Sequence, residues 1–407
     1  MDDPLATQAA PETERLFYED AYRREFEAAV TETMIHEGQP AVVLDRTCFY
    51  PESGGQPADT GSLDGAKVSY VFEDGPRIVH LLDREVGAAA VRGVIDWERR
   101  FDHMQQHTGQ HILSQCFIER LNGETKSFHL GADVSTLEIG LPAATEEGLA
   151  GVETLANAVV LENRDVTTYF VAEEAIGTVP LRRPPKKSGR IRVVEVSGFD
   201  YSACGGTHCR KTGEVGLIKI VRWERIRNNL RFEFLCGGRA LRDYARKNRL
   251  VVDLAARLSV QERDAPGAVE KLAGEAKEAR KKVRRLQEAM AVYEARELLA
   301  RTVGPLIFRS WPEKTGDEAK LLALNLIKSG SVAVLFAATA GERDHLVFGA
   351  SEKLGLNLKE LVPVVQALAP AKGGGSPSLV EMVIDKGADL EAILAAAAEH
   401  LKQKLPS

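Results

Sequence analysis

The sequence has no run of about 18 or more apolar residues, so no segment is predicted to cross a membrane as a helix. Its first residues, Met1-Asp2-Asp3-Pro4, are acidic and lack an apolar core, which is unlike a secretory signal. The five cysteines are an odd number and include no Cys-x-x-Cys pair. They therefore favour a reduced, cytoplasmic location, with cysteines used for metal binding or packing rather than for disulfides.

The chain also lacks an excess of positive charge. Its 53 Lys and Arg residues stand against 59 Asp and Glu, a net charge of −6, which argues against a protein that coats nucleic acid generally. A local basic surface for one RNA stays compatible with this balance. The hydrophobic content of 44% is ordinary for a folded chain, and 407 residues are enough for several domains with their own cores.

Changes in the hydrophobic pattern predict an α+β multidomain protein with four parts. Residues 1–95 alternate short β-like runs with turns and are predicted to form a small N-terminal β-barrel-like domain. Residues 96–238 mix a long helix with strands, which predicts an α+β domain. After a helical segment, residues 303–407 alternate strands and helices again, which predicts a small α/β domain.

The segment 239–302 is rich in Ala, Glu, Lys, Arg and Leu. Apolar residues recur three and four apart along it in the pattern of a coiled coil. These seam residues are Val269, Leu272, Ala276, Ala279, Val283, Leu286, Met290 and Tyr293. Because Pro266-Gly267 interrupts the segment, the pattern predicts two helices in an antiparallel hairpin, which we interpret as a solvated spacer arm.

Two histidines lie four residues apart in a predicted helix that runs from about Trp97 to Asn122. On a helix, His107 and His111 are about 40° apart, on one face and away from the apolar stripe. Such a pair alone is a weak metal motif. Further along, Cys204 and His208 are also four residues apart, on a Gly-rich turn. The combined set of one thiolate and three imidazoles suits zinc better than magnesium or calcium.

Other residues near these positions keep alternatives open. His103, one turn before His107, is either a decoy or a substrate contact, and Cys209 is an alternative ligand beside His208. The loop from Thr47 to Gly61 is either a plain surface turn or a loop whose bare backbone approaches a ligand. In the second interpretation Thr47, Ser53 and Gln56 are its polar groups, beside Gly54-Gly55.

Two further stretches are candidates for contact with phosphate. The run from Arg182 to Arg192 holds six basic residues, Arg183 among them, and no acid, and it is either a solvated loop or a phosphate-backbone contact. In Ala371–Pro377, three glycines next to Lys372 could cradle a phosphate through backbone N–H groups. The Gly-Lys-Ser/Thr ending of a P-loop is missing there, so nucleotide hydrolysis is not expected.

Three of these motifs, taken in order, resemble the editing module of alanyl-tRNA synthetase and its free-standing relatives, the AlaX alanyl-tRNA editing proteins. They are the Thr47–Gln56 segment, with Phe49-Tyr50-x-Glu52-Ser53-Gly54-Gly55, then His107-x-x-x-His111, and Cys204-x-x-x-His208. The helical segment and the Gly373-Gly374-Gly375 stretch are similar to the synthetase's C-terminal domain, a DHH-associated fold. No aminoacylation domain is expected before the first motif, so the chain resembles the long form of AlaX.

The resemblance implies one zinc ion per chain, held by His107, His111, Cys204 and His208. It implies hydrolysis, in trans, of serine or glycine from mischarged tRNA(Ala), with the tRNA acceptor end as partner and a homodimer possible through the helical or C-terminal region. Catalytic roles fall on His107, His111, Thr47 and Gln56, with Thr47 recognising the serine hydroxyl. Substrate contacts fall on Ser53, Gly54, Gly55, Thr125 and His129, and tRNA contacts on Lys372, Gly373, Gly374, Gly375, Arg182 and Arg183. After Gly375, Ser376-Pro377-Ser378 replaces the Arg-Pro-Asp usual in the synthetase.

Two other functions fit the same motifs. One is a zinc-stabilised tRNA-binding module without catalysis, because four protein ligands close a tetrahedral site. The other is editing of a different mischarged tRNA, because the threonyl-tRNA synthetase editing domain shares the His-pair and Cys-His arrangement.

Overall fold

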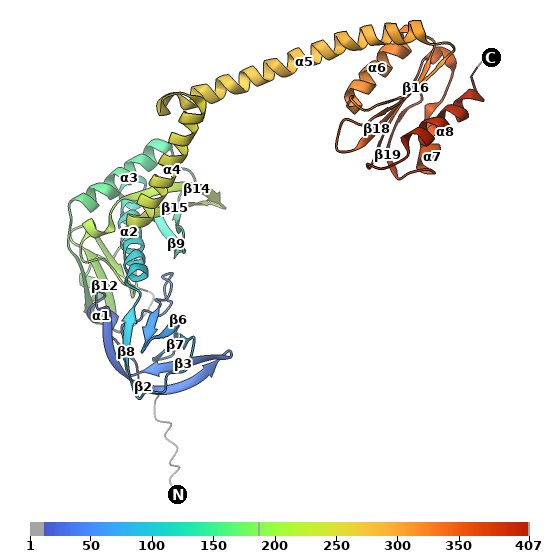
Figure 1. Ribbon diagram of the computed structural model, residues 1–407. Helices are drawn as coiled ribbons and strands as arrows, with labels where there is room; N and C mark the ends of the chain where they lie inside the picture. The colour runs from blue at the N-terminus through green and yellow to red at the C-terminus, as the bar shows by residue number, and fades with distance from the viewer. Residues whose placement is uncertain (1–11, 186–187, 406–407) are drawn as a thin grey trace. The chain divides into compact units, whose positions relative to one another are not determined.

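The computed structural model describes residues 12–185 and 188–405, and the chain divides into two compact units, Met1–Asp253 and Leu254–Ser407 (Figure 1). Each unit has its own hydrophobic clusters. Among the described residues, no helix combines the length and the apolar character needed to cross a membrane.

The first unit begins with a closed six-stranded barrel. Its strands, in the order in which they pair, are β2 (Glu25–His36), β3 (Gln39–Leu44), β7 (Arg77–Leu82), β6 (Ala66–Asp74), β5 (Gly61–Leu63) and β8 (Ala90–Ile95). Alternate residues such as Val68, Ile78 and Val91 are buried inside it, as the period of two in a strand requires. Next to the barrel, β1 (Glu14–Arg15) pairs with β4 (Arg46–Thr47), and α1 spans Leu16–Glu19.

A long buried helix, α2 (Trp97–Leu121), follows the barrel. It starts where the Asp96 side chain accepts the backbone N–H of Arg99, and it ends at Asn122, whose φ of 52° is left-handed. This agrees with the predicted helix from Trp97 to Asn122. Around it lie α3 (Glu146–Leu161) and two antiparallel sheets, β14 (Ile218–Ile226)–β15 (Asn229–Cys236)–β10 (Ser135–Gly140)–β9 (Glu124–Leu130) and β11 (Val166–Val171)–β12 (Ile191–Val196)–β13 (Asp200–Ala203).

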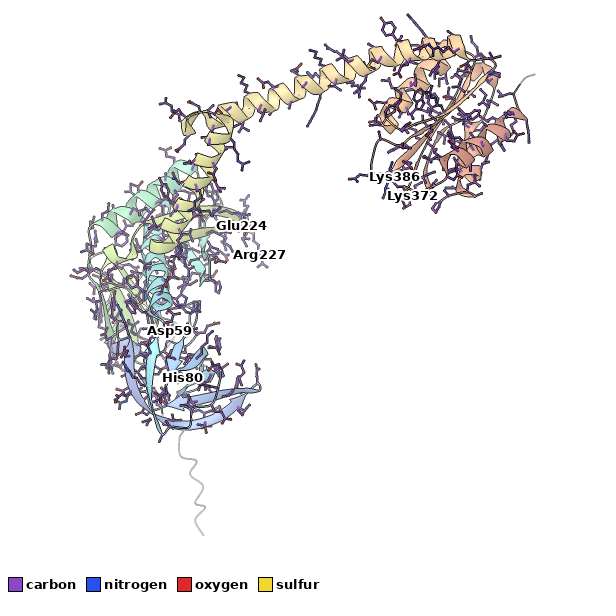
Figure 2. All side chains as sticks on the ribbon, in the orientation of Figure 1. Asp59, His80, Glu224, Arg227, Lys372 and Lys386 are labelled. Atoms are coloured by element: carbon purple, nitrogen blue, oxygen red, sulfur yellow. The ribbon has the colours of Figure 1, made fainter. Side chains whose placement is uncertain are left out.

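The barrel is joined to α2 by a fully buried ion pair. Arg100 on α2 donates through Nε to both carboxylate oxygens of Asp59, at 3.1 and 3.0 Å, and also contacts this carboxylate through Nη2. Its remaining N–H groups bond the backbone carbonyls of Ala21 (2.8 Å) and Cys48 (2.6 Å). Asp59 in turn accepts the backbone N–H of Tyr50, and it lies where the barrel meets α2 (Figure 2).

The helical segment differs from its prediction. The structure has α4 (Gly237–Leu258) and α5 (Ala265–Arg301), so the break lies at residues 259–264, and Pro266 sits in the first turn of α5, where proline is tolerated. The large seam residues of α5 are 43–70% exposed, and only Ala265, Ala291 and Ala295 of this helix are buried. The two predicted helices are thus present, and their antiparallel packing stays a prediction.

The second unit contains a mixed five-stranded sheet. Its strand order is β16 (Leu306–Trp311), β17 (Ala333–Ala338), β18 (Asp344–Ala350), β20 (Leu379–Ile384) and β19 (Ala371–Ser376), and only the β16–β17 pair is parallel. The helices of this unit beyond α5 are α6 (Gly316–Ser329), α7 (Leu361–Gln366) and α8 (Leu390–Lys402). α6 and α8 supply apolar side chains to separate clusters that include residues of this sheet.

The three-glycine stretch is an edge strand rather than a cradle loop. Lys372, Gly373, Gly374 and Gly375 lie in β19 and pair with β20, and all four are exposed. A Cβ at Gly373 would lie 2.1 Å from the carbonyl oxygen of Glu381, and its φ of 148° also favours glycine. These glycines thus permit a close approach of two strands. Their predicted contact with tRNA stays a prediction.

The barrel interior holds a neutral histidine whose titration can be tested. Burial lowers the pKa of His80 to about 4, while its bond to the Val42 carbonyl acts in the opposite direction. The unfolded chain binds this proton below about pH 6.5, and the folded barrel only below about pH 4. His80 should therefore lower the free energy of unfolding by about 3 kcal/mol as the pH falls from 6.5 to 4.

Replacing His80 by Gln removes this titration and keeps a partner for the Thr47 hydroxyl, which lies 2.8 Å from His80 Nε2. Urea unfolding of both proteins at several pH values measures the difference. We expect the stability advantage of the wild type over His80→Gln to shrink on acidification. An advantage that stays constant from pH 7 to pH 4.5 would show that His80 titrates normally.

Candidate metal centre

Four side chains from two distant segments meet at one buried point. His107 and His111 come from the middle of α2, and Cys204 and His208 from the turn after β13. Their ligand atoms all lie within 4.8 Å of one another. Cys204 Sγ is 3.4 Å from Nε2 of His107 and 3.4 Å from Nε2 of His208. The structure thus brings together the four residues that the sequence singled out.

Gln56 fixes the orientation of His107. Its Oε1 accepts the backbone N–H of Thr207 at 3.1 Å and lies 2.8 Å from His107 Nδ1, and its Nε2 donates to the Thr207 hydroxyl. Because Oε1 is an acceptor, His107 Nδ1 carries the proton, and the lone pair of Nε2 faces Cys204. Gln56 is therefore placed to support a ligand from behind. A direct catalytic role for it stays a prediction.

The other two histidines also have a partner on the outer side. His208 Nδ1 lies 3.2 Å from the hydroxyl of Thr108, which also accepts the backbone N–H of Cys209. His111 Nδ1 lies 3.2 Å from Oδ2 of Asp200, a charge contact without hydrogen-bond angles. Partners of this kind orient histidine ligands and set their tautomer.

The turn that carries Cys204 and His208 is held in place by hydrogen bonds to its backbone carbonyl groups. Arg192, which is 7% exposed, donates to the carbonyl oxygens of Cys204 (3.0 Å) and Gly206 (2.8 Å). A Cβ at Gly206 would lie 2.2 Å from His107 Cε1, so only glycine fits against this imidazole. The glycine-rich sequence of the turn follows from this close approach.

The charges of the cluster favour the form that binds metals. Burial acts to raise the pKa of the Cys204 thiol, but His107 and His208 outweigh it and hold this pKa well below its usual value. Burial and the charge of His107 keep the pKa of His208 well below its usual value. A thiolate beside the neutral imidazole of His208 is the protonation state of a ligand pair. At His111, burial acts to lower the pKa, but the contacts with Asp200 and Cys204 outweigh it and raise this pKa, so metal binding there would displace a proton.

The donor set fits a zinc ion. Zinc–nitrogen and zinc–sulfur bonds of about 2.0–2.3 Å place two ligand atoms of a tetrahedral site roughly 3.5 Å apart. The 3.4 Å distances from Cys204 Sγ to the two imidazoles agree with this spacing. The cluster can therefore bind a metal such as zinc through His107, His111, Cys204 and His208.

The glycine-rich loop reaches the cluster through a tight turn. Ser53 and Gln56 pair through their backbones, with Gly54 and Gly55 between them at φ 57° and 85°. Two consecutive positive φ values are characteristic of a type I′ turn, which strongly favours Gly-Gly. The Gly55 carbonyl accepts the N–H of Leu130, which ties the loop to β9.

The remaining predicted substrate residues lie at different depths. Thr125 is buried and donates to the Ser114 hydroxyl at 2.8 Å, whereas His129 is exposed. Thr47 is fully buried, and its hydroxyl contacts His80 and accepts the N–H of Phe49. These contacts engage Thr47 within the barrel. Recognition of a serine hydroxyl by Thr47 stays a prediction.

The basic run is partly buried, which corrects its interpretation as a solvated surface loop. Arg182 donates to the carbonyl oxygen of His111 at 3.0 Å, and its Nε lies 3.4 Å from Asp200 Oδ1, with 9% of the side chain exposed. Arg183 contacts the carbonyl of Thr125. Arg182 thus belongs to the surroundings of the cluster, because its charge faces a buried carboxylate. Residues 186–187 of this run lie outside the described residues.

Several residues of the site escaped the sequence interpretation. Asp200, Arg192 and Thr108 contact the ligand residues, but none of them stands in a recognisable spacing with the His pair. His103 is buried, its Nδ1 has no partner among the described residues, and burial lowers its pKa to about 4. Burial raises the pKa of Cys209, and among the described residues its Sγ is not one of the clustered ligand atoms.

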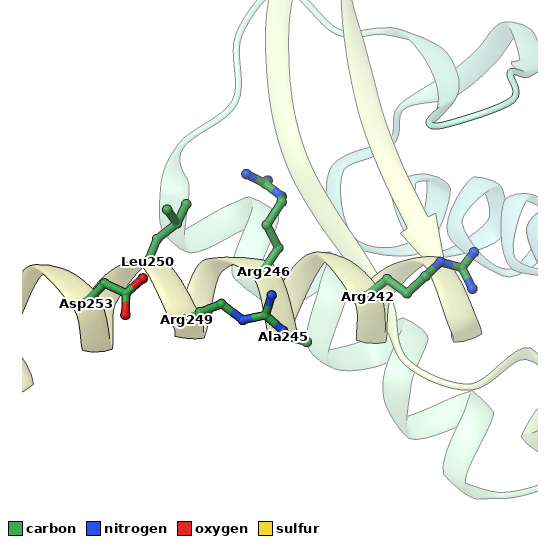
Figure 3. Close-up of a pocket in the computed structure, with 6 residues that line it drawn as sticks. All are labelled: Arg242, Ala245, Arg246, Arg249, Leu250 and Asp253. Carbon is green, nitrogen blue, oxygen red and sulfur yellow. The ribbon is translucent and has the colours of Figure 1, made fainter.

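A hollow on α4 lies apart from this cluster. Its lining residues are Arg242, Ala245, Arg246, Arg249, Leu250 and Asp253 (Figure 3). None of the four ligand residues takes part in it. The candidate site is defined by its donor atoms and their partners.

Asp200 offers a test of the outer contacts. Replacing Asp200 by Ala should weaken zinc binding by about 10–100-fold, because His111 loses the carboxylate at its Nδ1. Competition with a chromophoric chelator measures this affinity. Glu195→Ala, on the same sheet but outside the cluster, is the matched control and should leave the affinity unchanged. Equal affinity of Asp200→Ala and wild type would remove Asp200 from the site.

Comparison with known proteins places these features in a family context. Residues 191–232, which include Cys204 and His208, match the family described as the threonyl and alanyl tRNA synthetase second additional domain, and residues 5–99 match class II (A) tRNA synthetases. The chain is 34% identical over 401 residues to the alanine–tRNA ligase of Pyrococcus furiosus. It is 35% identical over 390 residues to that of Thermococcus kodakarensis.

These matches cover 94% and 91% of this chain but only 42% of each relative, so the chain spans less than half the length of these ligases. Among solved structures, it is similar to the C-Ala domain of Aquifex aeolicus alanyl-tRNA synthetase, with 24% identity, a TM-score of 0.21, and coverage of 25% of this chain and 91% of that domain. By its sequence, the chain is homologous to a region of alanyl-tRNA synthetase.

Proposed function

We propose that this protein hydrolyses the ester bond that joins serine or glycine to mischarged tRNA(Ala). Support comes from the homology to alanine–tRNA ligases along nearly the whole chain and from the match of residues 191–232 to the second additional domain. The acceptor end of the tRNA would be the part that enters the site. The observation that carries the proposal is the buried cluster of His107, His111, Cys204 and His208 within this homologous region.

An editing activity answers a physical limit of amino-acid selection. A pocket shaped for alanine rejects glycine or serine by only a few kcal/mol, since one methyl or hydroxyl group is the entire difference. A second, hydrolytic site removes the products that this pocket lets through. Such a site must spare alanyl-tRNA, which has neither the hydroxyl of serine nor the small size of glycine.

The proposed reaction is ester hydrolysis. The oxygen of a water molecule adds to the ester carbonyl carbon, the bond from this carbon to the ribose oxygen breaks, and this oxygen takes up a proton. A zinc ion held by the cluster would supply Lewis acidity toward the carbonyl or the water. The chain's own part is to hold the ligands: Gln56 keeps the proton of His107 at Nδ1, and Arg192 fixes the turn of Cys204 and His208.

The test is release of labelled amino acid from four substrates. Ser-tRNA(Ala) and Gly-tRNA(Ala) are the expected substrates, and Ala-tRNA(Ala) and Ser-tRNA(Thr) are the controls for amino acid and tRNA. Rapid loss of serine or glycine from tRNA(Ala), with alanine retained, is the expected result. Loss from Ser-tRNA(Thr) alone would assign the protein to a different tRNA.

A second function is favoured by the closed ligand set. Four protein ligands complete a tetrahedral zinc site, which is the usual form of structural zinc. A zinc-stabilised module that binds tRNA without hydrolysing the ester would have this form. Retained zinc and tRNA affinity, with no release from any of the four substrates, would establish this function instead.

A further inference from the structure

The middle of α5 carries the densest block of positive charge on this helix. The nine residues from Lys277 to Arg285 include six basic residues and a single acid, Glu278, in a chain whose net charge is −6. Every side chain of this block is exposed. The basic residues are Lys277, Arg280, Lys281, Lys282, Arg284 and Arg285.

Five of the six basic residues share one face of the helix. At about 100° per residue, Arg280, Arg284, Lys277, Lys281 and Arg285 fall in that order within an arc of about 140°. The seam residues Leu272, Val283 and Met290 lie on the opposite side. The charge is therefore ordered into a strip rather than spread around the helix. We call these five residues the basic strip.

Little of this charge is neutralised within the chain. Lys281 pairs with Glu278 at 2.7 Å and Arg284 with Glu288 at 3.1 Å, both as exposed contacts. In the described part of the chain, Lys277, Arg280 and Arg285 form no ion pair. Exposed pairs contribute about 0–1 kcal/mol, so even the paired residues stay free to exchange partners.

The strip projects from the side of α5 on which the rest of its unit lies. Ala291 and Ala295 are the buried residues in the C-terminal half of α5, and Ala295 belongs to the cluster that contains Ala319 and Leu322 of α6. Arg284 is seven residues from Ala291, and Lys277 is eighteen from Ala295, so each pair lies within about 20° on the helix. A ligand on the strip would thus also face the α6 side of this unit.

We propose that the basic strip of α5 binds the phosphate backbone of a structured RNA, and that this RNA is the tRNA substrate. The strip spans about 12 Å along the helix axis, which matches several successive phosphates of one strand. The choice of tRNA as the RNA rests on the proposed function. The choice of a phosphate backbone rests on the charge pattern. Long, flexible Lys and Arg side chains bind phosphates without recognising the base sequence.

The experiment compares K277Q/R280Q/R285Q with the wild type in binding to uncharged tRNA over a range of salt concentrations. The three substitutions remove three positive charges and break no ion pair. We expect the slope of log K against log salt to become less negative by about two to three, and the affinity at 0.1 M salt to fall at least about tenfold. K328Q/K353Q/K359Q is the control, because it removes three exposed, unpaired charges of the same unit, within the described residues.

Two measurements keep this inference separate from the proposed function. Circular dichroism checks that both variants keep their helix content. Hydrolysis of a serine ester of adenosine, which has no phosphate backbone for the strip to bind, should be unchanged in K277Q/R280Q/R285Q, whereas failure of the proposed function would remove it from the wild type as well. An unchanged salt slope, or equal losses in both triple variants, would overturn the inference. So would retained tRNA affinity with lost binding to anionic vesicles, which would point to a membrane as the partner.

Discussion

Replacing His107 by Ala is expected to remove zinc from the protein and to abolish hydrolysis of Ser-tRNA(Ala). His107 faces Cys204 Sγ through Nε2 at 3.4 Å, and its ring lies next to those of His111 and His208. Loss of one of four ligands opens the site, and the Cys204 thiolate loses a neighbour that holds its pKa down. Elemental analysis should fall from one zinc per chain to near zero, and the release of serine to the spontaneous rate.

The control for this substitution is His400→Ala, a half-exposed histidine of α8 that should keep both zinc and activity. Full activity in a His107→Ala protein shown to be free of metal would contradict the proposed role of the cluster. Zinc retained at one per chain, with activity lost, would assign His107 to substrate contact instead of metal binding.

Replacing Arg100 by Met is expected to destabilise the first unit by about 3–5 kcal/mol, because Asp59 would be left charged and fully buried without a partner. The Ala21 and Cys48 carbonyls also lose their donor. Urea unfolding followed by tryptophan fluorescence, to which Trp97 in the first turn of the same helix contributes, measures the loss.

The double variant Arg100→Met with Asp59→Leu separates the charge from the packing. Removing both charges should be less destabilising than removing Arg100 alone, since no uncompensated charge stays buried. Arg77→Met, in an exposed ion pair with Glu32, should change stability far less than Arg100→Met, because solvent screens an exposed pair. A double variant less stable than the single one would show that the Asp59 carboxylate stabilises the unit even without Arg100, through its hydrogen bond to the backbone N–H of Tyr50.

The sequence predicted the candidate site where the spacing of residues along the chain alone determines the positions of their side chains. His107 and His111 share a helix face because four residues make about one turn, and the helix bounds follow from Asp96 and Asn122 as caps. Cys204 and His208 could be paired with them by chemical type. The strand β6 of the barrel could also be predicted, because buried and exposed residues alternate at its start, whereas β7 is buried along most of its length.

The contacts around the ligands could not be predicted in this way. Asp200 and Arg182 meet His111 only because β13 and the loop after β11 pack against α2. Arg100 looks like an ordinary charged helix residue until Asp59 is brought against it. In each case the partner lies far along the chain, and no local pattern encodes the pairing.

The sequence was less informative about the packing of the helical segment, for a related reason. The spacing from Val269 to Tyr293 shows that one face of α5 is apolar, but it does not say which surface covers that face. The glycines of β19 misled the interpretation similarly, since close strand approach and a phosphate cradle both require residues without a Cβ. Glycine in the sequence indicates that the backbone can approach another group closely. The neighbouring elements decide which group that is.

The contacts of Gln56 and Arg100 have a consequence for dissecting this protein. Cleaving the chain between β8 and α2 would separate His107 from the amide that sets its tautomer, and a buried guanidinium from every acceptor it has. A fragment that starts at α2 would carry all four ligands and yet lack the support that makes them a site. In a calorimeter, the barrel and the helix should therefore melt together as one cooperative transition, and limited proteolysis should not yield a stable zinc-binding core without the barrel.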